Sequence, residues 1–148
     1  MSEQDIEIRR ATFKDLPQVI GVLAKVGLPV EGVTEHIKHF FIAESYGDLI
    51  GVSGIQVLSN EGLLRSTAVV SGFRNKGVGK KLINASMAHA KELGLKDLYL
   101  LTTSKKNYFA KLGFAEVTQE TVPHTVQNTL EYKEFCIGAY CMRISIKR

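Results

Sequence analysis

The sequence predicts a single mixed α/β (α+β) domain over residues 1–148, with a central sheet of about six to seven strands flanked by helices. Apolar segments within residues 40–70 are separated only by short turn sequences, which is typical of an antiparallel meander. A strand, a helix and a second strand then follow over residues 63–102, and such a unit normally makes a parallel pair through a right-handed crossover. No Pro- or Ser-rich linker interrupts the chain, so we expect one core.

The first elements carry clear local signals. Residues 6–9 alternate apolar and polar side chains, as a half-buried strand does. Asp15 precedes Leu-Pro, which is typical of a helix N-cap followed by proline in the first turn, and the apolar spacing predicts a helix over residues 16–26. Gly27 ends this pattern. Thr34 is then expected to cap a short second helix that runs to residue 39.

The later elements follow from periodicity and turn residues. Apolar residues recur at helical spacing over 78–93, and Gly94 stands where a C-cap glycine belongs, so this helix is the best defined in the chain. The remaining segments predict strands at 40–44, 49–57, 63–70, 97–102, 114–117 and 138–146, and a short helix at 107–112.

Composition and charge restrict the classes of partner. The net charge of +4 is modest, and no basic tract of five residues occurs, which favours a local anion site over a nucleic-acid surface. No apolar run reaches the roughly 18 to 20 residues that a membrane span needs, and the N-terminus is polar and acidic rather than like a signal peptide. We therefore expect a cytoplasmic protein that binds neither nucleic acid nor membrane.

The cysteines and histidines predict no metal centre. Cys136 and Cys141 would lie about 16 Å apart along one extended strand, beyond the reach of a disulfide, so both are expected to be free thiols. His36 and His39 are spaced for one helix face, but no third ligand accompanies them. We expect a solvated helix face there and no metal.

A glycine-containing loop before the best-defined helix is the strongest functional signal. The start of a helix leaves unpaired N–H donors and carries a partial positive charge, and Gly77 and Gly79 would let an anion approach the backbone. The loop lacks the Gly-Lys-Ser/Thr ending of a nucleotide P-loop and the first glycine of the dinucleotide fingerprint. It reads Arg74-Asn75-Lys76-Gly77-Val78-Gly79-Lys80.

The pattern Arg74-x-x-Gly77-x-Gly79 resembles the pyrophosphate loop of the GNAT acetyltransferase superfamily. Two further segments extend the resemblance over nearly the whole chain: Ala68-Val69-Val70, like the strand that contacts the pantetheine arm, and Lys111-Leu112-Gly113-Phe114, like the signature after strand five. The resemblance implies one GNAT domain that uses acetyl-coenzyme A as co-substrate. The implied cofactor-binding residues are Ala68, Val69, Val70, Arg74, Asn75, Lys76, Gly77, Val78, Gly79, Lys80 and Thr102.

The same resemblance implies catalytic positions. The backbone N–H of Val69 matches the donor that polarises the thioester carbonyl. The usual tyrosine acid is replaced by Phe109, which cannot donate a proton. The neighbouring Tyr108 can substitute only if the helix is rotated or irregular, because one helical step turns its side chain by about 100°; an ordinary packing aromatic is the alternative. Thr102 stands where the pantetheine-binding asparagine is usual, and its hydroxyl can still hydrogen-bond an amide.

The strand pattern also suggests residues that would bind or deprotonate the amine that accepts the acetyl group. Glu44 ends its strand, where an inward carboxylate would act as base; an exposed charge at a turn is the alternative. Arg65, with Ser66 and Thr67, is expected to bind substrate, because an arginine in this apolar strand would be costly unless paired or facing a wet cleft; an arginine at an exposed strand start is the alternative. Alternation along the strand predicts that Arg65, Thr67 and Val69 share one face.

Four segments, at residues 27–32, 62–66, 98–103 and 108–114, resemble more narrowly the bacterial arsenic-resistance N-acetyltransferases. That resemblance implies acetylation of a small amine, such as an amino-acid-like toxin of the arsinothricin or phosphinothricin type. Two alternatives stay open: a protein or peptide N-terminal acetyltransferase, and a non-catalytic acyl-coenzyme A-binding module. An exposed C-terminal strand is compatible with a homodimer.

Overall fold

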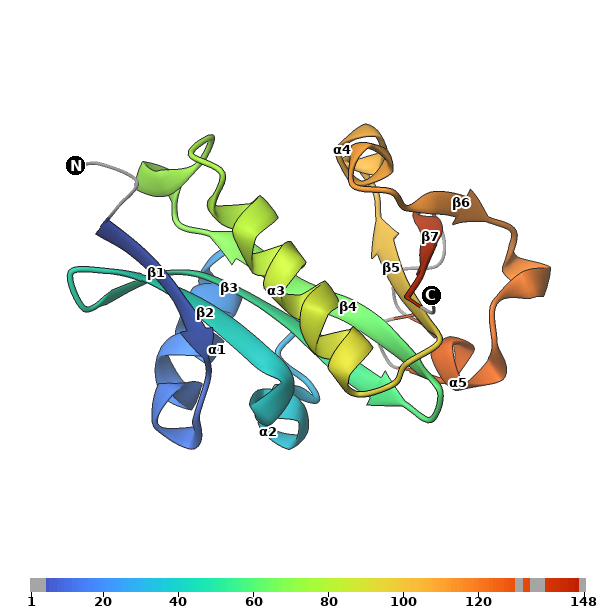
Figure 1. Cartoon of the computed structure of the whole chain (residues 1–148), viewed down its shortest axis with the longest axis horizontal. Helices are drawn as coiled ribbons and strands as arrows, with labels where there is room; N and C mark the ends of the chain where they lie inside the picture. The colour runs from blue at the N-terminus through green and yellow to red at the C-terminus, as the bar shows by residue number, and fades with distance from the viewer. Residues whose placement is uncertain (1–4, 130–131, 134–137, 147–148) are drawn as a thin grey trace. The chain divides into compact units, whose positions relative to one another are not determined.

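The computed structural model describes residues 5–129, 132–133 and 138–146 (Figure 1). The strands are β1 (Ile6–Arg10), β2 (Phe40–Ser45), β3 (Asp48–Leu58), β4 (Glu61–Val69), β5 (Asp97–Thr102), β6 (Ala115–Val117) and β7 (Tyr140–Ser145). The helices are α1 (Leu16–Lys25), α2 (Val33–His36), α3 (Val78–Glu92), α4 (Lys106–Lys111) and α5 (His124–Gln127), with short 3₁₀ turns between them.

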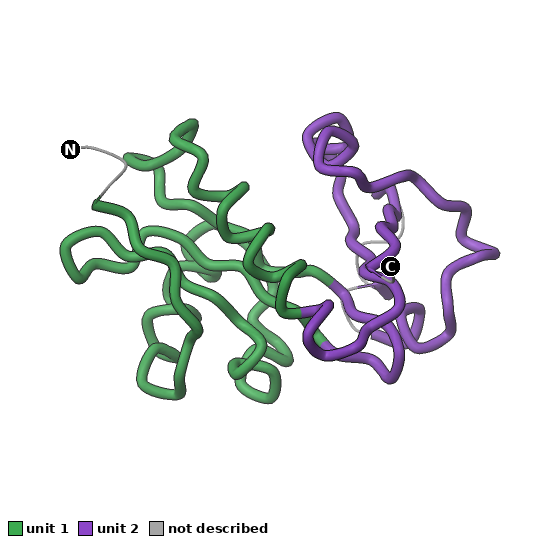
Figure 2. Tube along the Cα trace, in the orientation of Figure 1, with its two compact units in different colours: residues 1–56, 64–89 green, residues 57–63, 90–148 purple. Residues whose placement is uncertain are grey.

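The strands form one seven-stranded sheet in the order β1-β2-β3-β4-β5-β7-β6. This arrangement confirms the predicted mixed α/β class. The chain nevertheless separates into two compact units, shown in Figure 2: unit 1 comprises residues 1–56 and 64–89, and unit 2 comprises residues 57–63 and 90–148. Within the described part of the chain, no helix combines the length and apolar character needed to cross a membrane.

Unit 1 carries helices on both faces of its strands. On one face, side chains of α1 and α2 such as Leu23 and Val33 pack with Phe40, Val52 and Ala68 of the strands. On the other face, Val78 and Leu82 of α3 pack against Ala43 and Ile50. The strands between them therefore hold β4 and the start of α3 in a fixed relation, with apolar contacts on both sides.

Unit 2 contains the parallel pair that the crossover pattern predicted. β4 pairs with β5 in parallel over Glu61–Leu63, while β7 pairs antiparallel with both β5 and β6. A small apolar core, which includes Leu63, Tyr99 and Val126, covers one face of these strands. Cys141 belongs to this core and is a free thiol; Cys136 lies outside the described residues.

The second helix begins earlier than predicted. Thr34 is not its cap: α2 starts at Val33, its N-cap is Gly32 with φ of 83°, and a 3₁₀ turn continues from Ile37 to His39. Glycine is favoured at such a left-handed position because it has no Cβ. The side-chain oxygen of Thr34 misled the sequence interpretation, because a glycine N-cap offers no side-chain hydrogen bond to recognise.

Asp15 occupies the predicted N-cap position of α1, but its carboxylate does not bond to that helix. It accepts hydrogen bonds from Arg9 Nη2 at 2.8 Å and from the backbone N–H of Thr12 at 2.7 Å. Arg9 also donates to Glu44 of β2 at 3.1 Å. The hydrogen bond from Arg9 is the main reason that the pKa of Asp15 falls from 3.8 to about 2. Arg9 thus ties β1 to β2 and to the start of α1.

We predict that Asp15→Asn destabilises the protein by about 1 to 2 kcal/mol at pH 7, a range reduced for solvent screening around the half-exposed Arg9. The depressed pKa means that the carboxylate stabilises the folded state fully above about pH 4, and that this contribution disappears as the pH falls towards about 2. Urea unfolding of both proteins at pH 7, 4 and 2 measures it. A free-energy difference that stays constant down to pH 2 would contradict this origin.

Candidate functional site

The loop between β4 and α3 leaves open space beside its backbone. After a 3₁₀ turn at residues 71–73, Asn75 and Gly77 adopt left-handed φ values of 64° and 79°. A Cβ built on Gly77 would meet nothing within 4 Å. Val78 is only 1% exposed and anchors the first turn of α3 in the unit 1 core. Val78 therefore anchors the end of the loop in the core, while the backbone at Gly77 faces open space.

This loop has the features of an anion site. α3 is 15 residues long, so its first-turn N–H groups and its dipole present partial positive charge to the open side of Gly77. The side chains of Arg74, Lys76 and Lys80 are exposed around it. Arg74 is aimed back at β4, since its Nε donates to the carbonyl of Val69 at 3.0 Å. The predicted loop residues are thus brought together.

The backbone N–H groups of Val69, at the end of β4, and of Val70, just after it, point to opposite edges of the strand. The N–H of Val70 donates to the carbonyl of Ile50 on β3 at 2.9 Å. Because successive N–H groups of an extended chain point to opposite edges, the N–H of Val69 points away from β3. The side chains alternate too: Ala68 packs with α1 and α2, whereas Val69 packs with α3.

The backbone at Ser66 shows that the prediction of one shared face for Arg65, Thr67 and Val69 is wrong. Arg65, Thr67 and Val69 do not share a face, because Ser66 takes a left-handed φ of 63° and breaks the alternation of β4. Arg65 extends to the connection between α1 and α2, while Val69 lies on the face covered by α3. The hydroxyl of Thr67 instead lies 2.8 Å from that of Ser53 on β3. A serine in this conformation has no clear sequence signal.

Arg65 is buried, with 5% of its surface exposed. Its Nε donates to Ser66 Oγ at 3.0 Å, Nη1 to Gln56 Oε1 at 3.3 Å and Nη2 to the carbonyl of Pro29 at 3.2 Å. A Cβ on Gly32 would lie 3.0 Å from Nη1. The guanidinium therefore fixes the entry into α2, and glycine at position 32 lets the two approach.

Glu44 lies at the end of β2, as predicted, but in an ion pair. Both its carboxylate oxygens accept from Arg9, at 3.1 and 3.2 Å. Arg9 is far from Glu44 in sequence, so the pattern of one strand could not have revealed this pairing. The contact gives Glu44 a role in joining β1 to β2.

Unit 2 holds the other predicted residues. Thr102 ends β5 with 9% of its surface exposed, and its Oγ1 accepts from the backbone N–H of Lys105 at 3.0 Å, so it shapes the turn into α4. Tyr108 of α4 is 40% exposed and packs edge-on against Phe109, which packs in turn against Phe114. Partial burial raises the pKa of Tyr108 above its usual value.

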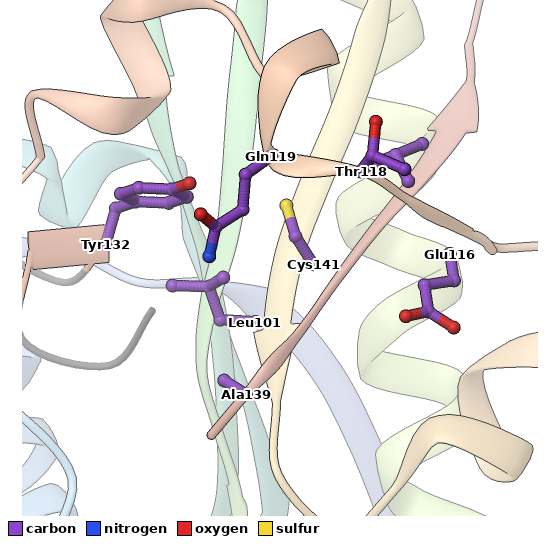
Figure 3. A pocket seen from close by; sticks show the side chains of 8 residues that line it. Leu101, Glu116, Thr118, Gln119, Tyr132, Ala139 and Cys141 are labelled. Atoms are coloured by element: carbon purple, nitrogen blue, oxygen red, sulfur yellow. The ribbon is translucent and has the colours of Figure 1, made fainter. Parts of the chain in front are cut away.

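Unit 2 also contains a pocket of about 200 Å³ that the sequence did not indicate. Figure 3 shows the carboxamide of Gln119 near the Tyr132 ring and the Cys141 thiol, with Leu101 of β5 beneath them. Burial raises the pKa of Cys141 to about 11. A cavity of about 150 Å³ accepts benzene, so this one has room for a small side chain. Its walls come from β5, β6, β7 and the segment after β6, and no local motif joins such distant residues.

The chain is similar to known acetyltransferases. The model of the acetyltransferase (GNAT) domain family matches residues 36–116, more than half of the chain. An uncharacterized N-acetyltransferase of Chlorobaculum tepidum is 34% identical over 98 residues, which cover 66% of this chain and 63% of the relative. The amino-acid acetyltransferase of Azotobacter vinelandii is 31% identical over 140 residues, 88% of this chain but only 32% of the relative.

Solved structures share the fold. The N-acetylglutamate synthase of Neisseria gonorrhoeae, complexed with coenzyme A and N-acetyl-glutamate, superposes with a TM-score of 0.84 at 23% identity over 99% of this chain and 36% of its own. Rv2747 of Mycobacterium tuberculosis, solved with coenzyme A, gives a TM-score of 0.80 at 22% identity and covers 94% of this chain and 98% of its own.

The matched region runs from the last residue of α2 into β6 and so includes the kinked strand β4, the open loop at Gly77 and the helix α3 that follows it. The chain spans 63% of the first of these relatives and about a third of the amino-acid acetyltransferase. With the family model, the loop and the seven-stranded sheet in agreement, the chain belongs to the GNAT acetyltransferase family.

Proposed function

We propose that this protein transfers the acetyl group of acetyl-coenzyme A to the amino group of a small amino-acid-like substrate. The open loop at Gly77 carries the proposal. Its exposed cations and the first turn of α3 suit the pyrophosphate of coenzyme A, and the absence of any atom within 4 Å of a Cβ at Gly77 leaves room for it. Two structures of this fold were solved with coenzyme A, which supports the assignment.

The acceptor class is suggested by the relatives. Several amino-acid acetyltransferases are 26 to 31% identical to this chain over most of its length, and one structural neighbour holds N-acetyl-glutamate. The named relatives give no support for the arsenic-resistance subfamily, or for an organoarsenical or toxin acceptor. We therefore propose an amino acid, tested by acetyl-coenzyme A turnover with a panel that contains L-glutamate, other amino acids, peptides and amines without a carboxylate.

In the proposed reaction, the free amine attacks the thioester carbonyl and forms a tetrahedral intermediate. The Val69 N–H points away from β3, so it is free of the pairing that holds Val70 to Ile50 and would donate to the oxyanion. The C–S bond then breaks, the nitrogen loses its remaining extra proton, and the thiolate of coenzyme A gains one. The products are the N-acetyl amine and free coenzyme A.

A non-catalytic acyl-coenzyme A-binding module is the second candidate. One observation favours it: Phe109, packed between Tyr108 and Phe114, stands where the acid is usual and has no proton to donate. Binding of coenzyme A without turnover of any amine in the panel would favour this module over the enzyme.

We predict that Gly77→Glu abolishes coenzyme A binding while the protein stays folded, because the side chain would enter the open space and its charge would repel a pyrophosphate. Calorimetric titration with coenzyme A measures the affinity, and circular dichroism checks the fold. Gly77→Ala is the matched control, since it shares the strain of a φ of 79° without the charge and should weaken binding less. Equal affinity of a folded Gly77→Glu and the parent protein would remove the loop assignment.

We predict that Tyr108→Phe lowers kcat no more than a few-fold. Tyr108 is 40% exposed and its pKa is raised, so solvent is the more available proton donor for the thiolate. Tyr46→Phe, which changes another exposed tyrosine, is the control. A loss of about a hundredfold or more, the lower range for a positioned general acid, would instead identify Tyr108 as the donor.

We predict that Arg65→Lys lowers the Tm and reduces turnover of amines with and without a carboxylate alike, because the buried guanidinium is held by Ser66, Gln56 and the carbonyl of Pro29, and lysine keeps the charge but loses the fork. Gln56→Met is the control: it removes one partner of Arg65 but keeps the guanidinium, and should lower the Tm less. Thermal unfolding and turnover of both amine classes measure the effect. A loss confined to amines that carry a carboxylate, with an unchanged Tm, would instead identify Arg65 as a substrate-binding residue.

A further inference from the structure

Arg74 makes a contact with β4 that a role in anion binding alone does not explain. Its Nε donates to the carbonyl of Val69 at 3.0 Å, so the side chain folds back across the 3₁₀ turn that separates it from β4. Arg74 is exposed, and its Nη1 and Nη2 have no hydrogen-bond partner among the residues that the structure describes. The guanidinium therefore holds the strand with one nitrogen and leaves the other two available to an anion.

The carbonyl that Arg74 binds lies at the same edge of β4 as the proposed oxyanion donor. In an extended strand, the N–H and the C=O of one residue point to the same edge, and those of the next residue point to the opposite edge. The N–H of Val70 points to β3, where it donates to the carbonyl of Ile50 at 2.9 Å. The N–H and the carbonyl of Val69 therefore both face away from β3, and the Arg74 guanidinium lies at the edge where the oxyanion would form.

Few other contacts hold this edge of β4. In the described part of the chain, the pairing of β4 with β5 covers Glu61–Leu63 and ends well before Val69. The peptide that joins Val69 to Val70 is held at its N–H by β3 and at its carbonyl by Arg74. The side chain of Val69 packs beside α3. With the peptide held at both ends and the side chain packed, the N–H of Val69 keeps one direction.

We propose that Arg74 positions the oxyanion donor for acetyl transfer as well as binding the cofactor: its Nε keeps the Val69 peptide in place, while Nη1 and Nη2 bind the pyrophosphate of coenzyme A. This inference rests on the proposed function. One guanidinium can hold both groups because its donors form a rigid planar fork. Arg74 is a positioning residue, since it acts on the oxyanion through Val69. Cofactor binding and the alignment of the Val69 N–H are thus linked by one side chain within unit 1.

Two substitutions separate the two roles of Arg74. Arg74→Gln places an amide nitrogen where Nε stood, since both atoms are bonded to Cδ, but it removes the charge and the outer nitrogens. It should keep kcat within a few-fold of the parent and weaken coenzyme A binding roughly tenfold or more. Arg74→Lys keeps a positive charge but has a carbon in the place of Nε. It should retain most of the coenzyme A affinity and lower kcat about tenfold or more at saturating acetyl-coenzyme A.

Calorimetry with coenzyme A measures the affinity, and turnover of L-glutamate or another accepted amino acid measures kcat. NMR of the free protein adds a readout apart from activity, because a hydrogen bond to a carbonyl deshields its carbon. The Val69 carbonyl resonance should move upfield in Arg74→Lys and stay close to the parent in Arg74→Gln. Lys76→Gln is the matched control, because Lys76 is an exposed cation of the same loop. It should weaken coenzyme A binding without moving that resonance.

If Arg74→Lys keeps the kcat and the Val69 resonance of the parent, the positioning role is wrong while acetyl transfer stands. Equal losses of kcat in Arg74→Lys and Arg74→Gln would also overturn it, because the loss would then not follow the donor at the Nε position. Absence of turnover in the parent protein would instead overturn the proposed function. The NMR comparison would then still decide whether Arg74 holds the Val69 peptide.

Discussion

The left-handed backbone at Ser66 is the constraint on which the organisation of β4 depends. Without it, a regular pleat would place Arg65 and Val69 on one face and crowd a charged side chain against the apolar contacts of α3. The kink instead directs Arg65 to the carbonyl of Pro29 and keeps Val69 packed beside α3. One strained residue thus separates the contacts of Arg65 beside α2 from those of Val69 beside α3. Strain of this kind is often retained at functional sites.

Local sequence signals were sufficient for most of the fold. The periodicity of residues 78–93 and the turn residues between the meander strands placed α3, β2, β3 and β4 within a few residues of their bounds. The sequence predictions failed where tertiary contacts determine how a helix begins. α2 begins at a glycine cap that has no side-chain signature, and the carboxylate of Asp15 is held by Arg9 of β1 rather than by the helix it precedes.

The residues of the candidate site also differ in how far the sequence could predict them. The loop from Arg74 to Lys80 is contiguous, so the sequence alone displays the pattern that resembles the GNAT pyrophosphate loop. The surroundings of Arg65 could not, because Pro29 and Gln56 come from distant segments and the face of β4 changes at Ser66. The ion pair of Glu44 and the pocket at Gln119 likewise join residues that only the folded chain brings together.

The burial of Cys141 has a consequence for the thiol chemistry of unit 2. Disulfide exchange requires a thiolate, and a thiol with a pKa of about 11 is almost entirely protonated at neutral pH. Cys141 is therefore a poor partner for a mixed disulfide with an external disulfide. The apolar core of unit 2 can line a pocket with sulfur and still leave that pocket chemically inert to the thiol chemistry around it.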